Sequence, residues 1–218
     1  MRSSSAGGLT AALSLVLVVL AGCSGGGSDG TATEGRLVEQ VCGGFADAAE
    51  TRAALAAVVG GDTLVEDRYE PDATLKALRE ADGELTTGEL AHGTLYCKVR
   101  KAGDEEPAFS IDFREALVVP GGRGDGTFTA FRTGSEAQAS DRFAKILFHC
   151  RGARAPKGAR DRIVAAELER TNDLALRKED LVVHQVTVLN AAARAVADRL
   201  GCTDTELVDG VPSPLAAS

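Results

Sequence analysis

The chain has few aromatic residues and few histidines. Its 218 residues include no Trp, two Tyr, seven Phe and three His. Grooves that bind sugars or peptides often use Trp and Tyr as contact platforms, so the composition disfavours a lectin-like function. No Cys-x-x-Cys pair occurs, and His92, His149 and His184 show no ligand spacing with the cysteines. We therefore expect no metal and no cofactor.

Motifs for nucleophilic catalysis are absent as well. Ser110, Ser135 and Ser140 do not lie in a Gly-x-Ser-x-Gly turn, which is the usual setting of a hydrolase serine. The acidic residues fall mainly in expected turns and on helix faces, where solvation explains them. We assign no catalytic residue, and an enzyme is the less favoured interpretation.

The chain is acidic, with a formal net charge of −8 at pH 7. Such a protein has no bulk attraction for nucleic acid or anionic lipid, so we expect no nucleic-acid partner. One segment, RGARAPKGAR at 151–160, is locally basic. It is a candidate anion-binding loop, with a solvated turn as the alternative; its cations are Arg151, Arg154, Lys157 and Arg160.

The longest apolar run, Leu9 to Ala21, is too short to span a bilayer, because a membrane helix needs about 20 apolar residues. Arg2 precedes it, which matches the charged and apolar regions of a secretory signal peptide. We expect residues 1–22 to be removed. A signal with an accidental cysteine, or a short anchor helix, is the alternative.

The run ends in Leu20, Ala21, Gly22 and Cys23, a sequence that resembles the lipobox of bacterial lipoproteins. The resemblance implies that the Cys23 thiol receives diacylglycerol and that a peptidase cuts just before it. Two acyl chains hold a protein stably at a membrane, which a single chain does not. The excess of Arg over Lys, together with abundant Ala, Gly, Val and Leu, resembles secreted lipoproteins of actinobacteria of the Streptomyces kind.

These features predict the organisation of the chain. Residues 23–35 form a lipidated cysteine followed by a Gly/Ser-rich linker with a reach of about 20 Å. Residues 36–202 form the folded domain, and residues 203–218 form a flexible C-terminal tail. The expected location is the outer face of the cytoplasmic membrane.

Four cysteines remain once Cys23 is assigned to lipid. Outside the cytoplasm an even set of cysteines indicates disulfides, and four allow three pairings. We favour Cys42 with Cys97 and Cys150 with Cys202. Each bridge would join one end of a helix to a sheet.

Helical periodicity is clearest at Leu181–Leu200, which Gly201 should end. Residues 37–59 also look helical, with a break at Gly43 and Gly44. A third helix is expected over 73–81, with Asp72 as N-cap.

Alternating apolar residues predict five strands: 94–99, 109–119, 127–132, 143–150 and 162–169. The first three should form a meander through turns at 102–107 and 120–126, and the last two a hairpin. A helix over 162–170 is the alternative. The fold class is therefore α+β, an antiparallel sheet of about five strands covered by helices and held by two disulfides.

Composition and motifs together favour an extracytoplasmic lipoprotein that binds an envelope protein or a ligand. A cell-envelope hydrolase that acts on cell-wall material and a small-ligand receptor are the alternatives.

Overall fold

The structure is a computed structural model that describes residues 35–81, 92–116, 128–152 and 162–216. The chain divides into two compact units, Met1–Ala32 and Thr33–Ser218, and every described residue belongs to the second. The predicted signal peptide, lipobox and most of the linker lie outside the described residues.

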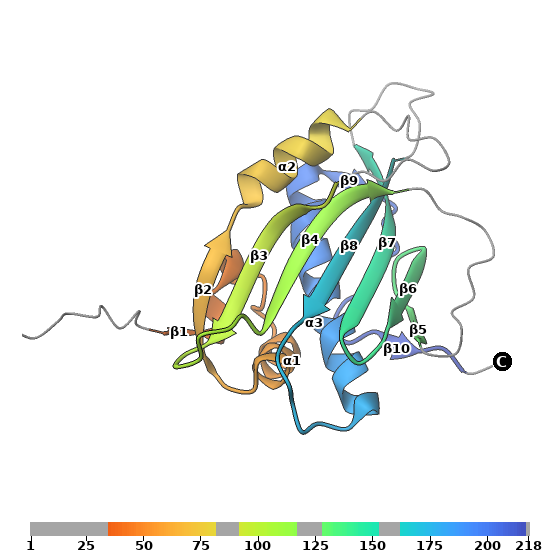
Figure 1. Ribbon diagram of the computed structural model, residues 1–218. Coiled ribbons are helices and arrows are strands. Elements are labelled where there is room, and N and C mark those ends of the chain that lie inside the picture. Colours follow the sequence, from red (N-terminus) through yellow and green to blue (C-terminus); the bar gives the residue numbers. More distant parts are fainter. Residues whose placement is uncertain (1–34, 82–91, 117–127, 153–161, 217–218) are drawn as a thin grey trace, which may run out of the picture. The chain divides into compact units, whose positions relative to one another are not determined.

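Within the described residues, three α-helices accompany a ten-stranded sheet. Figure 1 shows their arrangement. The helices are α1 (Ala49–Val59), α2 (Pro71–Glu80) and α3 (Lys178–Leu200), and two short 3-10 helices, η1 (Val38–Gln40) and η2 (Cys42–Gly44), precede α1. The strands are β1 (Arg36–Leu37), β2 (Thr63–Tyr69), β3 (Thr94–Lys101), β4 (Phe109–Ala116), β5 (Thr129–Arg132), β6 (Glu136–Ala139), β7 (Phe143–Gly152), β8 (Arg162–Arg170), β9 (Cys202–Thr203) and β10 (Ser213–Pro214).

The sheet is antiparallel throughout, in the order β1-β2-β3-β4-β8-β7-β6-β5-β10, with β9 paired to β7. The expected hairpins β3–β4 and β7–β8 are both present. They are joined through β4 and β8, whose register places Ile111 opposite Leu168. This pairing unites two local hairpins in one sheet.

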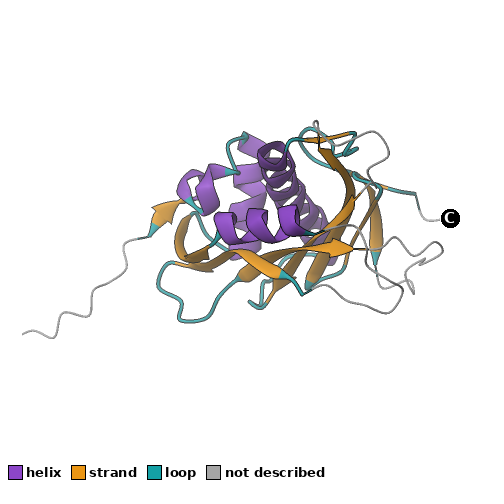
Figure 2. Cartoon of the chain, turned by 90° about the horizontal axis from the view of Figure 1, so that it is seen from above, coloured by secondary structure: helices purple, strands orange, loops and turns teal. Residues whose placement is uncertain are grey.

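All three helices pack on the same face of the sheet, as the two perpendicular views show (Figures 1 and 2). Alternate residues of the central strands point toward the helices and are buried with α3 residues such as Val186 and Leu189. The strand side of this core consists mainly of Phe109, Ile111, Phe113, Ile146, Phe148, Val164, Ala166 and Leu168. The other face of the sheet carries the intervening side chains, and we call it the open face.

Helix α3 confirms the prediction for 181–200 and begins three residues earlier, at Lys178. Gly201 ends it in the left-handed region, at φ 70°, where its N–H donates to the carbonyls of Ala197 and Asp198. A residue without a Cβ adopts that conformation without strain. Within the described ranges, no helix is both long and apolar enough to cross a membrane.

The number of strands differs from the expected five. Three of the additional strands, β1, β9 and β10, have two residues each and are too short to show alternation. Two others were missed for their composition. Three of the seven residues of β2, TLVEDRY, are charged, and β6 is only the four residues EAQA. Both β9 and β10 include residues of the segment 203–218 that we expected to be a tail.

The predicted meander is wrong at its third strand. Strand β5 lies near the far edge of the sheet, and β8 occupies the place beside β4. The predicted turn at 120–126 lies outside the described residues. Segment 162–170 is a strand and not the alternative helix, because it is hydrogen bonded to β4 on one side and to β7 on the other.

Two smaller predictions, the N-cap of α2 and the inward-facing residues of β3, also differ from the structure. Helix α2 starts at Pro71, with Glu70 as N-cap, so the expected N-cap Asp72 lies in its first turn. Proline is favoured at the first helical position because the missing N–H would have no partner there. In β3, a register shift between Leu95 and Cys97 turns Tyr96 into the core, where its ring packs edge-on against Phe113.

The cysteines pair as the sequence analysis favoured. Cys42 in η2 joins Cys97 in β3, with 5.7 Å between their Cα atoms. Cys150 in β7 joins Cys202, which follows α3, with 4.6 Å between their Cα atoms. Each disulfide therefore ties a strand to a segment next to a helix.

A buried polar triangle holds the segment after α3 against the sheet. The Thr133 hydroxyl donates to Asn190 Oδ1 over 2.6 Å, and Asn190 Nδ2 donates to the Val208 carbonyl over 2.8 Å. The Val208 N–H donates to Thr133 Oγ1 over 3.2 Å, which closes the triangle. Asn190 and Thr133 are almost fully buried, so each bond replaces one that water would otherwise make.

Replacing Asn190 by Ala should lower the free energy of unfolding by about 2 to 3 kcal/mol, because Val208 and Thr133 would keep buried polar atoms without partners. Chemical denaturation of the two proteins measures the difference. Gln138→Ala, at a partly exposed site on β6, is the control and should cost well under 1 kcal/mol. An equal effect of both substitutions would show that the triangle does not stabilise the fold.

Candidate functional site

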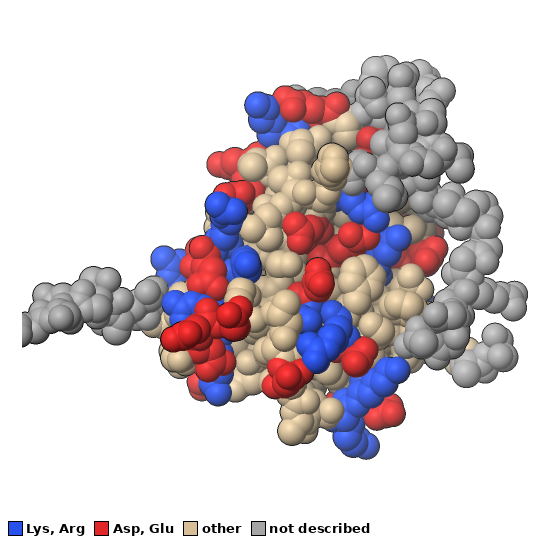
Figure 3. All heavy atoms as spheres, viewed as in Figure 1, with Lys and Arg blue, Asp and Glu red and all other residues tan. Residues whose placement is uncertain are grey.

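The open face contains a hollow of about 510 Å³ over β4, β8 and the start of β7. Figure 3 shows acidic side chains near the middle of this face, next to uncharged surface. The hollow is lined by one aromatic, one Arg, one His, one Gly and three acidic residues: His92, Gly93, Asp112, Arg114, Phe143, Glu167 and Glu169.

Strand alternation explains why these side chains share a face. In β4, Ile111 and Phe113 point into the core, so Asp112 between them points to the open face. In β8 the same alternation places Glu167 and Glu169 outward. The register sets Asp112 directly opposite Glu167, and two acidic side chains therefore face each other across adjacent strands.

An ion pair fixes one side of the hollow. Arg114 Nη2 lies 2.7 Å from Glu167 Oε1, and Arg114 Nε lies 3.3 Å from Glu167 Oε2. Both side chains are mostly buried, with 19% and 24% of their surface exposed. A two-point contact of this kind holds the guanidinium and the carboxylate in one orientation. Arg114 and Glu167 thus largely neutralise each other.

Asp112 has an unfavourable environment for its charge. Burial raises the pKa of its carboxyl, and the carboxylates of Glu167 and Glu169 raise it further. The Ser110 hydroxyl, 3.3 Å from Asp112 Oδ2, and the nearby Lys98 act in the opposite direction. The upward effects dominate, because removing a carboxylate from water disfavours its ionised form.

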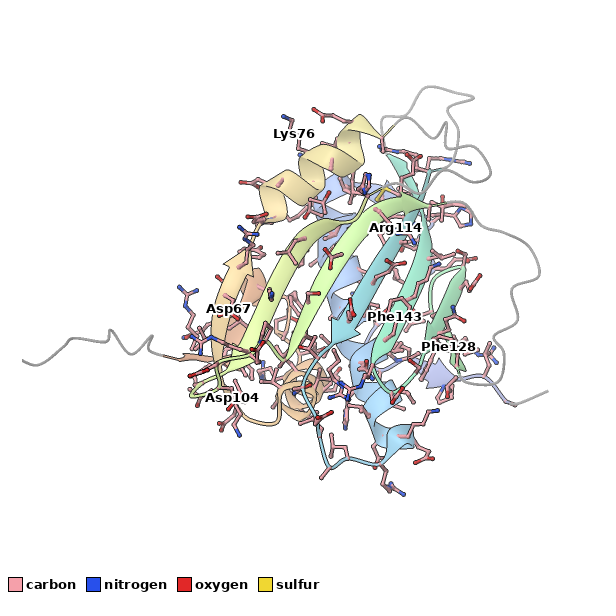
Figure 4. All side chains as sticks on the ribbon, viewed as in Figure 1. Asp67, Lys76, Asp104, Arg114, Phe128 and Phe143 are labelled. Atoms are coloured by element: carbon pink, nitrogen blue, oxygen red, sulfur yellow. A yellow bond between two sulfur atoms is a disulfide. The ribbon has the colours of Figure 1, made fainter. Side chains whose placement is uncertain are left out.

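An aromatic wall closes the hollow on the β7 side. Phe143 lies directly across from Glu169 in the β7–β8 register. Its ring meets that of Phe128 edge-on, with 6.5 Å between the centroids and 83° between the planes. Figure 4 shows Phe143 and Phe128 beside each other on the sheet, with Arg114 farther along.

Gly93 leaves Asp112 accessible. A Cβ at position 93 would come within 3.4 Å of the Asp112 Cβ, so a larger side chain there would extend over the carboxylate. Both Gly93 and the preceding His92 are exposed. The small residue keeps this side of the hollow open to solvent.

The site residues expected from the sequence are placed only in part. Leu20, Ala21, Gly22 and Cys23, and the basic residues Arg154, Lys157 and Arg160, lie outside the described residues. Arg151 lies in β7 and lines a different hollow, of about 270 Å³, with His149, Thr203, Asp204 and Glu206. Because two acidic residues share that hollow, its charge is mixed. The anion-binding role of the loop remains a prediction.

The three histidines lie apart from one another. His92 borders the 510 Å³ hollow, His149 borders the smaller one, and His184 lies on α3. Among the described residues, no group of three His, Cys, Asp or Glu side chains is arranged to hold a metal ion.

The sequence alone does not single out Asp112, Arg114, Glu167 and Glu169 as a group. Alternation in each strand places these residues on the polar side, which is the signal that the sequence contains. Their convergence depends on the pairing of β4 with β8, which brings together residues as far apart in sequence as Asp112 and Glu167.

Comparison with known proteins adds no further constraint. No family model, curated protein or solved structure matches this chain. The candidate function is therefore argued from its own residues.

Replacing Asp112 by Asn should stabilise the protein at neutral pH, because the folded state disfavours the ionised carboxyl. A carboxyl whose folded pKa is raised binds protons more readily in the folded state, so its ionisation costs stability as pH rises above its unfolded value near 3.8. The melting temperature of the variant should exceed that of the natural protein at pH 7, and the gap should shrink toward pH 4.

Thermal unfolding between pH 4 and pH 8 measures this gap. Asp104→Asn, at an exposed position of the β3–β4 turn, is the matched control and should show little change at any pH. A lower melting temperature for Asp112→Asn at pH 7 would contradict the stated environment of Asp112.

Proposed function

We propose that this protein is a lipid-anchored extracytoplasmic binding module that binds its ligand on the open face of the sheet. The anchor is Cys23, acylated after removal of residues 1–22. The linker up to residue 35 separates the folded domain from the membrane surface. The expected partners are the membrane, through the lipid, and an envelope protein or ligand, through the fold.

Two observations support the extracytoplasmic location. The lipobox-like sequence follows an apolar run of signal-peptide length. The four remaining cysteines lie in two pairs at disulfide distance, and structural disulfides persist in oxidising compartments.

The observation that carries the binding role is the asymmetry of the sheet. Its helix-covered face is filled by apolar side chains, whereas the open face bears a hollow of about 510 Å³ with charged and aromatic residues. The size falls within the range of small-molecule sites. A stable scaffold with a polar hollow on one rigid face is suited to binding without a chemical step.

One observation favours an enzyme of the cell envelope as the second candidate. Asp112, whose pKa is raised by burial, stands opposite a second carboxyl, Glu167, and a general acid and base pair also brings two carboxyls together. However, Arg114 contacts both oxygens of Glu167, so this carboxylate is poorly placed to accept a proton. Binding therefore remains the better supported function.

Replacing Cys23 by Ser should remove the acyl mass and shift the protein from membranes to the soluble fraction, because serine lacks the thiol that receives the lipid. Membrane fractionation and intact-mass measurement test this outcome. Ser24→Ala, the neighbouring position, is the control and should remain lipidated and membrane-bound. A natural protein whose intact mass shows no acyl group would refute the proposed anchor.

The binding role predicts that the protein binds a component of the native cell envelope and that this binding requires the hollow. The Cys23→Ser chain, immobilised and exposed to envelope extract, should retain a component that is lost when Asp112→Asn and Glu169→Gln are combined. The control combines Asp104→Asn with Glu106→Gln in the β3–β4 turn, which removes the same charge elsewhere. Equal retention by all three proteins, measured by mass spectrometry, would argue against the open face as the binding surface.

A further inference from the structure

We infer that the hollow on the open face takes an organic cation, an ammonium or guanidinium group carried on an apolar chain. The inference rests on the proposed function and specifies its ligand class. It follows from three features of the hollow: its remaining negative charge, its aromatic wall and its lack of a metal-binding arrangement among the described residues.

The first feature is the charge that remains after the internal ion pair is formed. Arg114 engages both oxygens of Glu167, which leaves Asp112 and Glu169 as the acidic groups facing the hollow. Two lysines lie outside the lining. Lys98, on the neighbouring strand, lowers the pKa of Asp112, and Lys145 stands opposite Glu167 in the β7–β8 register. A ligand with a positive group would offset the repulsion among the carboxylates, whereas an anion would add to it.

Asp112 also has unused capacity to accept hydrogen bonds. Among the described residues, Ser110 is its hydrogen-bond donor, over 3.3 Å. A carboxylate has about four lone-pair sites, so an ammonium or guanidinium group has room to donate to it. A bond of this charge-assisted kind is stronger than one between neutral groups.

The second feature is the ring of Phe143. It lies opposite Glu169 in the strand register and borders the same hollow. An aromatic face attracts a cation within about 6 Å of its centroid, and its carbon atoms also contact an alkyl chain. A carboxylate next to an aromatic ring therefore suits a cation that has an apolar part.

The third feature distinguishes an organic cation from a metal ion. Divalent cations such as Ca²⁺ and Mg²⁺ need several oxygen ligands around one point. Although three acidic residues line the hollow, the described residues contain no such grouping of His, Cys, Asp or Glu. The hollow, at about 510 Å³, is also large for a bare ion and ordinary for a small organic molecule.

The test is a titration of the isotope-labelled Cys23→Ser chain, followed by the backbone amide signals in NMR spectra. Three probes are compared at equal ionic strength: pentylamine, 1-pentanol and magnesium chloride. Pentylamine should give saturable shifts in the middle of β4, at the start of β7 and near the end of β8, where the strands line the hollow. Pentanol has the same carbon chain without charge and should give much weaker shifts, and magnesium should give none there.

The variants assign the binding to the named side chains. Asp112→Asn and Glu169→Gln should each weaken pentylamine binding by about tenfold, since each removes a charged acceptor of nearly unchanged shape. Phe143→Leu should weaken it about two- to fivefold, the range of an exposed cation–π contact. Asp104→Asn should leave it unchanged, because Asp104 lies in a turn away from Arg114 and Phe143 (Figure 4).

The source of the cation is resolved by a fourth probe, the peptide acetyl-Gly-Gly-Lys-Gly-Gly-amide. Binding of both pentylamine and the peptide at the hollow indicates a lysine side chain of a polypeptide, and binding of pentylamine alone indicates a free amine. Equal shifts with pentanol or magnesium, or equal weakening by Asp104→Asn, would overturn the inference. If the envelope component depends on the hollow but no amine binds, the ligand class is wrong and the binding function stands.

Discussion

The pairing of β4 with β8 is the contact on which the rest of this structure depends. It runs from Phe109 opposite Arg170 to Ala116 opposite Ile163, and it joins the N-terminal strands to the C-terminal ones. On one side of this pair, Ile111 and Leu168 belong to the core beneath the helices. On the other side, Asp112 and Glu167 point to the open face, where they lie partly buried. One register therefore produces both the hydrophobic core and the candidate site.

The disulfides and the buried Asn190 triangle hold the helical layer to that sheet. Cys42–Cys97 ties the segment before α1 to β3, and Cys150–Cys202 ties the end of α3 to β7. Cross-links of this sequence separation restrict the unfolded chain considerably, by the loop-entropy model. The helices are thus fixed on one face, and the other face is left to present side chains from rigid strands, a favourable basis for recognition.

The cation site inferred on the open face would give a strongly acidic protein selectivity. Bulk negative charge attracts any cation weakly and is screened by salt. At the hollow, by contrast, Arg114 neutralises Glu167, and an aromatic ring stands beside the remaining carboxylates. In the proposed site, this arrangement would select for shape and apolar content as well as for charge. A lipid anchor at Cys23 would keep this face near the membrane surface, within reach of envelope components.

Local residue patterns were sufficient to predict the α+β class, the two main hairpins and helix α3. Each of these depends on a signal that spans only a few positions: alternation in a strand, the residues of a turn, or the glycine that ends a helix. They were also sufficient to favour the cysteine pairing. They could not reveal β2, whose sequence lacks clear alternation, or β6, which alternates over only four residues of low strand propensity. They also could not give the place of β5. Which strands become neighbours is decided when one face of every strand is buried in a common core. The grouping of Asp112 with Glu167 follows from that choice of neighbours. That is a long-range condition, which no single segment of the chain contains.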